Sequence, residues 1–174
     1  MTVDLKIHPT VREFIICTNG SDLIVPKKGD WLWLLLKQHL TLSMDYHPIP
    51  ADERSQYIRI QLLDASGAPV VNHSMPKNAK AIHLNPLFRN SLSERGQNVI
   101  ANHLRSQFKE CFHNFMSGAV ASGAEHAASI ELFCQTYHLT MNQISEDMLK
   151  KSWQRSPQKG SLMKVVKQFC PLIF

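Results

Sequence analysis

The segment FCQTYHLTMNQISEDMLKKSWQR, residues 133–155, places two amphipathic stretches on either side of a short break. One helical face of the first stretch is apolar, with residues three and four apart: Ile130, Phe133, Cys134 and Tyr137. The second stretch has an apolar half and a polar half. The residues of the apolar half are Ile144, Met148, Leu149 and Trp153. Those of the polar half are Gln143, Lys150, Lys151 and Gln154. The pattern predicts helices over about 126–137 and 145–155, with Ser145 as the N-cap of the second and Leu139 filling the gap between them.

A longer amphipathic stretch precedes this pair. Ser91 or Ser93 is a candidate cap for a helix reaching about Ser117, and its apolar face holds Ile100, Leu104, Phe108, Cys111, Phe112 and Phe115. The second half of the chain is therefore predicted to contain three helices. The last two are joined by a short turn, which is also the outline of a helix-turn-helix.

The first half of the chain mixes strand and helix patterns. Short strands are predicted at 3–7, 22–25 and 56–64, with further candidates at 70–71 and 81–84. Helices are predicted over 10–18 and, after an Asp30 N-cap, over 31–42. We expect an α+β fold, in which a small N-terminal sheet with two helices precedes the three-helix half. The predicted parts are 1–90 (α+β), 91–157 (helical) and 158–174 (a basic and apolar tail).

The positive charge is concentrated at one end of the chain. The net charge is +5, and residues 148–174 contain no acidic residue but six basic ones: Lys150, Lys151, Arg155, Lys159, Lys164 and Lys167. The other 13 basic residues are balanced by all 14 acidic ones. Such asymmetry indicates a polyanionic partner, although a solubilising tail has the same composition.

Duplex DNA is the partner that this charge pattern favours. We expect lysines and arginines of the last helix and tail to contact phosphates, and Gln154 and Arg155 to reach base edges. The predicted contact residues are Lys150, Lys151, Gln154, Arg155 and Lys159. Glu146 and Asp147 stand at the start of the last helix, where phosphates would repel them, so we expect this helix to lie across the backbone. Arg105 and Lys109 are further cations whose position relative to this group the sequence leaves open. The alternative is a plain helical hairpin with a solvated basic face.

The pattern I-x-x-F-C-x-x-Y-x-L-x-x-x-x-I-S-x-x-x-L-K-K-x-W-x-R over 130–155 resembles the C-terminal part of uncharacterised small proteins from Bacteroides-type mobile elements and phages. The stretches 14–22 and 93–101 are similar as well. The resemblance implies a small cytoplasmic DNA-binding protein. The apolar ending, residues 165–174, departs from the polar basic ending expected of that group, and it favours a second function, a protein-interaction module or homodimer contact.

Other chemistry is less well supported by the sequence. Cys111, His113, Cys134 and His138 form a possible zinc set, but Cys111 and His113 diverge on a helix and Cys134 belongs to an apolar stripe, so we expect a packed, reduced cysteine and no cofactor. No G-x-S-x-G, phosphate-binding glycine loop or H-E-x-x-H occurs, and we do not expect an enzyme.

The tryptophan-rich stretch near residue 31 has two interpretations. Trp31 and Trp33, with Lys27 and Lys28, form a possible stacking platform for single strands, but the leucines between and after them favour a core helix. The longest apolar run, 31–36, is far shorter than the roughly 20 residues that span a bilayer, so we expect no membrane partner. The chain start lacks the features of a signal peptide. In a cytoplasmic protein, as the resemblance implies, the four scattered cysteines are expected to be reduced and packed.

Overall fold

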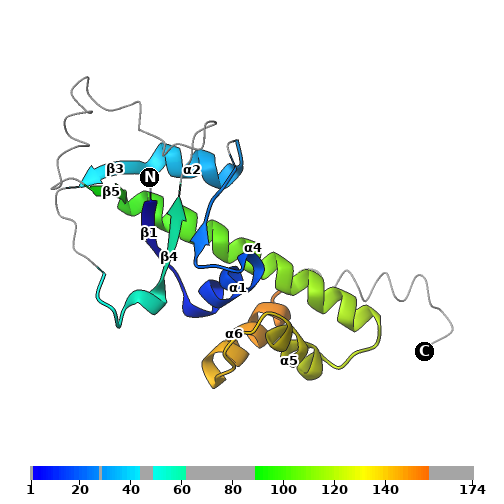
Figure 1. The fold of residues 1–174 in the computed structure, drawn as a ribbon. Helices are drawn as coiled ribbons and strands as arrows, with labels where there is room; N and C mark the ends of the chain where they lie inside the picture. Colours follow the sequence, from blue (N-terminus) through cyan, green and yellow to red (C-terminus); the bar gives the residue numbers. More distant parts are fainter. Residues whose placement is uncertain (1, 28, 44–48, 62–88, 157–174) are drawn as a thin grey trace. The chain divides into compact units, whose positions relative to one another are not determined.

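The structure, a computed structural model, describes residues 2–27, 29–43, 49–61 and 89–156 (Figure 1). The chain divides into an N-terminal unit, Met1–Leu104, and a C-terminal unit, Arg105–Phe174. The boundary between them falls inside one long helix. The predicted α+β class is confirmed, because strands and two helices come first and the remaining helices follow.

A three-stranded sheet of order β1-β4-β2 forms the N-terminal unit together with two helices and a strand pair (Figure 1). Strand β1 (Thr2–Lys6) runs antiparallel to β4 (Tyr57–Gln61), and β2 (Leu23–Ile24) runs parallel to β4. Alternation along the strands divides the sheet into two faces. The side chains of one face are buried, namely Val3, Leu5, Ile58 and Ile60. On the other face Asp4 lies opposite Arg59 in the register.

Helix α1 (Pro9–Asn19) begins with proline in its first turn, where the missing N–H costs no hydrogen bond. It ends at Gly20, whose φ of 69° is the left-handed conformation that glycine adopts without a steric penalty. Its inner face is buried through Val11, Phe14 and Ile15. The predicted helix over 10–18 therefore agrees with α1 to within one residue at each end.

Helix α2 (Trp31–His39) is shorter than predicted. The expected helix over 31–42 is wrong after His39, because Leu40 turns to extended geometry and β3 (Leu40–Ser43) pairs antiparallel with β5 (Arg89–Leu92). Strand β5 was not predicted. Asp30 precedes α2 as expected, but its carboxylate accepts a hydrogen bond from the Lys27 N–H rather than from the helix.

The long helix α4 (Glu94–Ala121) is the one element shared by both units. It is preceded by Ser93, whose Oγ accepts a hydrogen bond of 3.1 Å from the Gly96 N–H, as a cap does. Gly96 packs so tightly on His39 that a Cβ at residue 96 would collide with that side chain. The helix continues past the predicted end at Ser117 and stops before Gly123, which has a φ of 86°.

The C-terminal unit contains the last part of α4 with α5 (His126–Thr136) and α6 (Gln143–Gln154) (Figure 1). Phe133 of α5 is fully buried at its centre. The centroid of its ring lies 5.0 Å from that of Phe112 and 5.3 Å from that of Phe115, and both pairs have edge-to-face geometry. Leu149 and Trp153 complete this core from α6. Phe133, Cys134, Leu149 and Trp153 of the predicted apolar stripes are therefore buried, as expected, whereas Met148 is half-buried.

A capping box fixes the turn between α5 and α6. The Asn142 Oδ1 accepts a hydrogen bond of 2.8 Å from the Ser145 N–H, and the Ser145 Oγ accepts one of 3.0 Å from the Asn142 N–H. The N-cap is therefore Asn142, and the prediction of Ser145 was wrong by three residues because Asn142 has the extended backbone that an N-cap adopts. Leu139 is buried in this turn, as expected.

Several predictions lie outside the described residues: the strands at 70–71 and 81–84, Lys159, and the tail 158–174. Of the helices that the structure describes, none has the length and apolarity needed to cross a membrane.

Candidate nucleic-acid interface

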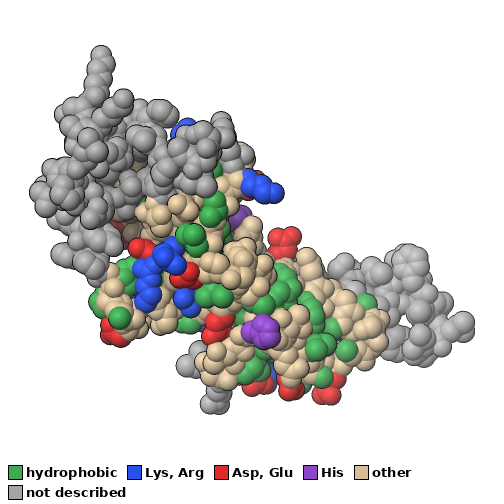
Figure 2. Space-filling view, in the orientation of Figure 1, with side chains coloured by type: hydrophobic (Ala, Val, Ile, Leu, Met, Phe, Trp, Pro, Cys, Tyr) green, Lys and Arg blue, Asp and Glu red, His purple; other side chains and the backbone are tan. Residues whose placement is uncertain are grey.

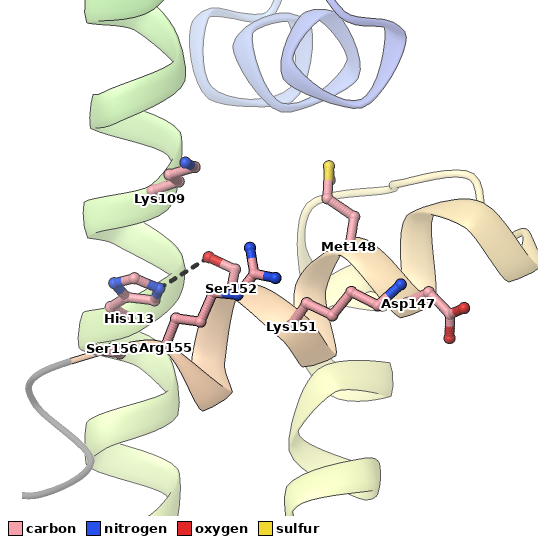
Figure 3. Close-up of a pocket in the computed structure, with 8 residues that line it drawn as sticks. All are labelled: Lys109, His113, Asp147, Met148, Lys151, Ser152, Arg155 and Ser156. Atoms are coloured by element: carbon pink, nitrogen blue, oxygen red, sulfur yellow. Dashed lines mark hydrogen bonds between the residues drawn. The ribbon is translucent and has the colours of Figure 1, made fainter.

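An open groove of about 690 Å³ runs between α4 and α6 within the C-terminal unit (Figure 3). Its walls carry three cations, one carboxylate and a histidine. The lining residues are Lys109 and His113 of α4, and Asp147, Met148, Lys151, Ser152, Arg155 and Ser156 from α6 and the residues after it. Because three cations surround a single carboxylate, the groove has a local excess of positive charge.

Two helices contribute these cations through regular spacing. Lys109 and His113 are four residues apart, which places them on one face of α4. Lys151 and Arg155 have the same spacing on α6. Trp153 and Leu149 bury the neighbouring face of α6, so packing of the apolar stripe sets which cations face the groove.

The two adjacent lysines of α6 have different surroundings. Lys150 forms an ion pair with Glu146 one turn earlier, and Glu146 raises the pKa of Lys150. Lys151 lines the groove and extends along α6 on the side of Asp147 (Figure 3). Within the described part of the chain, no ion pair engages Lys109, Lys151 or Arg155. These three cations are therefore available to an external anion.

A hydrogen bond joins the two walls of the groove. The His113 Nε2 lies 3.0 Å from the Ser152 Oγ, and Figure 3 shows the imidazole of α4 pointing at the α6 serine. Burial lowers the pKa of His113 below its usual value of 6.5, and the nearby Lys109 ammonium lowers it further, while a hydrogen bond to Ser152 opposes them. The net shift favours the neutral form of His113 in the absence of a ligand.

The predicted contact residues are distributed unevenly around this groove. Lys151 and Arg155 line it, Lys150 is paired with Glu146, and Gln154 is exposed on α6 without lining it. Of the two cations whose position the sequence left open, Lys109 lines the groove and Arg105 does not. His113 and Ser152 were not predicted as contact residues. The sequence signal for His113 is its i, i+4 spacing from Lys109 beside an apolar stripe.

Charge on the rest of the C-terminal unit is balanced. Residues 105–156 carry as many basic as acidic side chains: Arg105, Lys109, Lys150, Lys151 and Arg155 against Glu110, Glu125, Glu131, Glu146 and Asp147. Figure 2 shows Asp and Glu side chains along the lower edge of the region where Figure 1 draws α5 and α6. The positive excess is thus a local property of the groove.

The structure describes the residues of the possible zinc set and the two tryptophans near residue 31. Cys134 is buried in the core, and the Cys111 Sγ lies 3.1 Å from the Tyr137 hydroxyl. In the described ranges, no three His, Cys, Asp or Glu side chains converge as a metal site requires. Trp33 is buried, whereas Trp31 is 48% exposed and stacks on His103 with ring centroids 3.5 Å apart.

The Ser152–His113 pair has the geometry of a nucleophile beside a base. Such a base is normally oriented by a third group. Among the residues with described side chains, no carboxylate hydrogen-bonds to His113. Ser152 lies within α6, where the backbone N–H groups are engaged in the helix. The cations make anion binding the better supported chemistry of the groove.

Comparisons with protein-family models, with curated proteins and with solved structures found no match to this chain. The residues themselves carry the functional argument.

Proposed function

We propose that the chain binds duplex DNA without catalysing a reaction, with the groove between α4 and α6 facing the phosphate backbone. In keeping with the resemblance noted in the sequence, its role would be that of a small regulator of a mobile element or phage. The observation that carries the proposal is the convergence of Lys109, Lys151 and Arg155, from two helices, on one open groove without ion pairs among the described residues. Lysine and arginine arranged in this way are the usual phosphate contacts of DNA-binding proteins.

The orientation of α6 follows from its charges. Glu146 is in the first turn and Asp147 follows it, while Lys151 is in the last turn and Arg155 is the C-cap. A helix-turn-helix that inserted the start of α6 into the major groove would bring the two carboxylates close to phosphates. We therefore propose that the flank of α6 beside α4 lies against the backbone, and that recognition is largely independent of base sequence.

The test is a salt titration of affinity for a short fluorescent duplex. If Lys109, Lys151 and Arg155 each neutralise one phosphate, the plot of log K against log salt has a slope of about −2.7. The variant with Lys109→Gln and Lys151→Gln should then lose about tenfold in affinity and reduce the steepness of that slope by about 1.8. Circular dichroism checks that the variant folds.

A matched control removes the same charge elsewhere. Lys150→Gln with Lys27→Gln lowers the net charge equally, but Lys150 is paired with Glu146 and Lys27 lies in the N-terminal unit. This control should retain the wild-type slope. Equal losses in both double variants, or no binding by the wild type at low salt, would show that the groove is not a DNA contact.

A further inference from the structure

His113 of α4 is the imidazole among the residues that line this groove. It is half-buried, lies on the same wall as Lys109, and is bonded across the groove to Ser152. The charged groups that line the groove with it are Lys109 from its own helix and Asp147, Lys151 and Arg155 from α6. Its ring also lies 6.2 Å from that of Trp153 and 5.7 Å from that of Phe112, measured between centroids.

We infer that His113 is a phosphate-recognition residue of this groove, and that the protein takes up one proton at His113 when DNA binds. The inference rests on the proposed function and adds the residue and the proton linkage to it. In the unliganded groove the neighbouring cations outnumber the one carboxylate, so a further positive charge on His113 is unfavourable. A phosphate in the groove reverses the sign of the local field and favours the imidazolium form.

The hydrogen bond to Ser152 gives this proton a second effect. A protonated imidazole donates from both ring nitrogens and accepts from neither. The Nε2–H must then donate to the Ser152 Oγ, which leaves the serine hydroxyl proton able to donate to a ligand. Protonation of His113 therefore adds one positive charge to the groove and fixes the Ser152 hydroxyl as a free donor, and both are complementary to a phosphate oxygen.

Proton uptake at His113 determines the direction in which affinity for DNA changes with pH. The pKa of His113 is below 6.5 in the free protein because of burial and Lys109, and a bound phosphate raises it. Since the complex holds more protons than the free protein, affinity for DNA rises as the pH falls through the range between the two pKa values. If the pKa rises by about one unit on binding, affinity increases about tenfold across that range.

The experiment measures affinity for the same duplex at constant ionic strength from about pH 8 to about pH 5.5, the range in which histidine titrates. Wild type should bind about tenfold more tightly at the acid end, and His113→Gln, which cannot take up the proton, should give a flat profile. His126→Gln is the matched control, because His126 is exposed on α5 and does not line the groove. It should follow the wild-type profile.

The outcomes separate the two proposals. If wild type and His113→Gln bind DNA with the same pH dependence, the proton linkage is overturned while DNA binding stands. If neither binds DNA at any pH, both proposals are overturned. Should His113→Gln fold poorly, NMR titration of the His113 ring in wild type, with and without the duplex, decides the question: an unchanged pKa overturns the inference, and an increase supports it.

Discussion

Lys150 and Lys151 are neighbours in the sequence but belong to different surfaces of α6. Lys150 is paired with Glu146, whereas Lys151 lines the groove that Lys109 and Arg155 also line. Successive residues on a helix point about 100° apart, so one step along the chain changes the surface to which a side chain belongs. The basic pair in the sequence is therefore one groove residue and one member of an ion pair on the helix surface.

This difference predicts different effects of two adjacent substitutions. Lys151→Gln should weaken binding of a DNA duplex about threefold to tenfold and reduce the steepness of the salt dependence by about 0.9. Lys150→Gln should leave both quantities within error and slightly lower the thermal midpoint, because Glu146 loses its partner. Fluorescence anisotropy over a range of salt concentrations measures the affinity for the duplex and its salt dependence. The reverse ranking of the two variants would contradict the assignment of the groove.

Two glycines in α4 predict opposite results for the same substitution. At Gly118 an added Cβ meets open space, so Gly118→Ala should stabilise the protein by about 0.5–1 kcal/mol through helix propensity. At Gly96 the added Cβ collides with His39, so Gly96→Ala should destabilise by about 1–3 kcal/mol in spite of the same propensity gain. Urea unfolding followed by circular dichroism gives both free energies. Stabilisation by both variants would mean that the start of α4 and the end of α2 are not in close contact.

Phe133 is the central residue of the C-terminal unit, and its neighbour Leu132 is 53% exposed. Phe133→Ala should reduce the free energy of unfolding by about 3–5 kcal/mol, because it removes a buried ring and leaves a cavity. Leu132→Ala should change it by no more than about 0.5 kcal/mol, as exposed substitutions do. Chemical denaturation monitored by Trp153 fluorescence reports on this unit if the other two tryptophans are replaced by phenylalanine. Similar losses for the two variants would place the wrong face of α5 in the core.

Two substitutions at Asn142 test whether the side-chain hydrogen bond of this N-cap residue stabilises α6. Asn142→Ala should cost about 1 kcal/mol, because the Ser145 N–H loses its acceptor at the start of α6. Asn142→Asp keeps an acceptor of similar quality and should lie within a few tenths of a kcal/mol of wild type. The measurement is the midpoint of urea unfolding. If alanine and aspartate behave alike, the hydrogen bond to Ser145 does not stabilise the helix.

The lowered pKa of His113 also predicts how stability depends on pH in the absence of DNA. The folded protein binds the imidazole proton less readily than the unfolded chain, whose histidine titrates near 6.5, so stability decreases as the pH falls below that value. The decrease stops once the pH is below the lowered pKa of the folded state. His103 is lowered by burial as well, so the decrease should be reduced but not abolished in His113→Gln. Thermal midpoints across pH test this, and an unchanged pH dependence in the variant would contradict it.

The limits of several elements could be read from local chemistry. Pro9 and Gly20 bound α1, and the alternation of Ile58 and Ile60 identifies the central strand β4. The apolar stripe containing Phe133 and Cys134 correctly predicts which face of α5 is buried. These signals are local because capping and side-chain periodicity depend on residues a few positions apart.

Strand β3 could not be predicted in the same way. Leu40 and Leu42 continue the apolar pattern of α2, and Leu40 is nevertheless extended because it pairs in the antiparallel register with Leu92, far along the chain. Pairing between distant residues overrides local helix preference, and no short window of sequence contains that information.

The sequence by itself determined that the positive charge lies at the C-terminal end and that α6 is amphipathic, since both follow from residue type and spacing. Only the tertiary structure decided that Lys109 and His113 of α4 lie in the same groove as Lys151, Ser152 and Arg155. The physical reason is that Phe112, Phe133 and Trp153 bury the facing sides of three helices, and their packing fixes the rotation of α4 and α6 about their axes. That rotation places Lys151 in the groove, whereas its neighbour Lys150 pairs with Glu146.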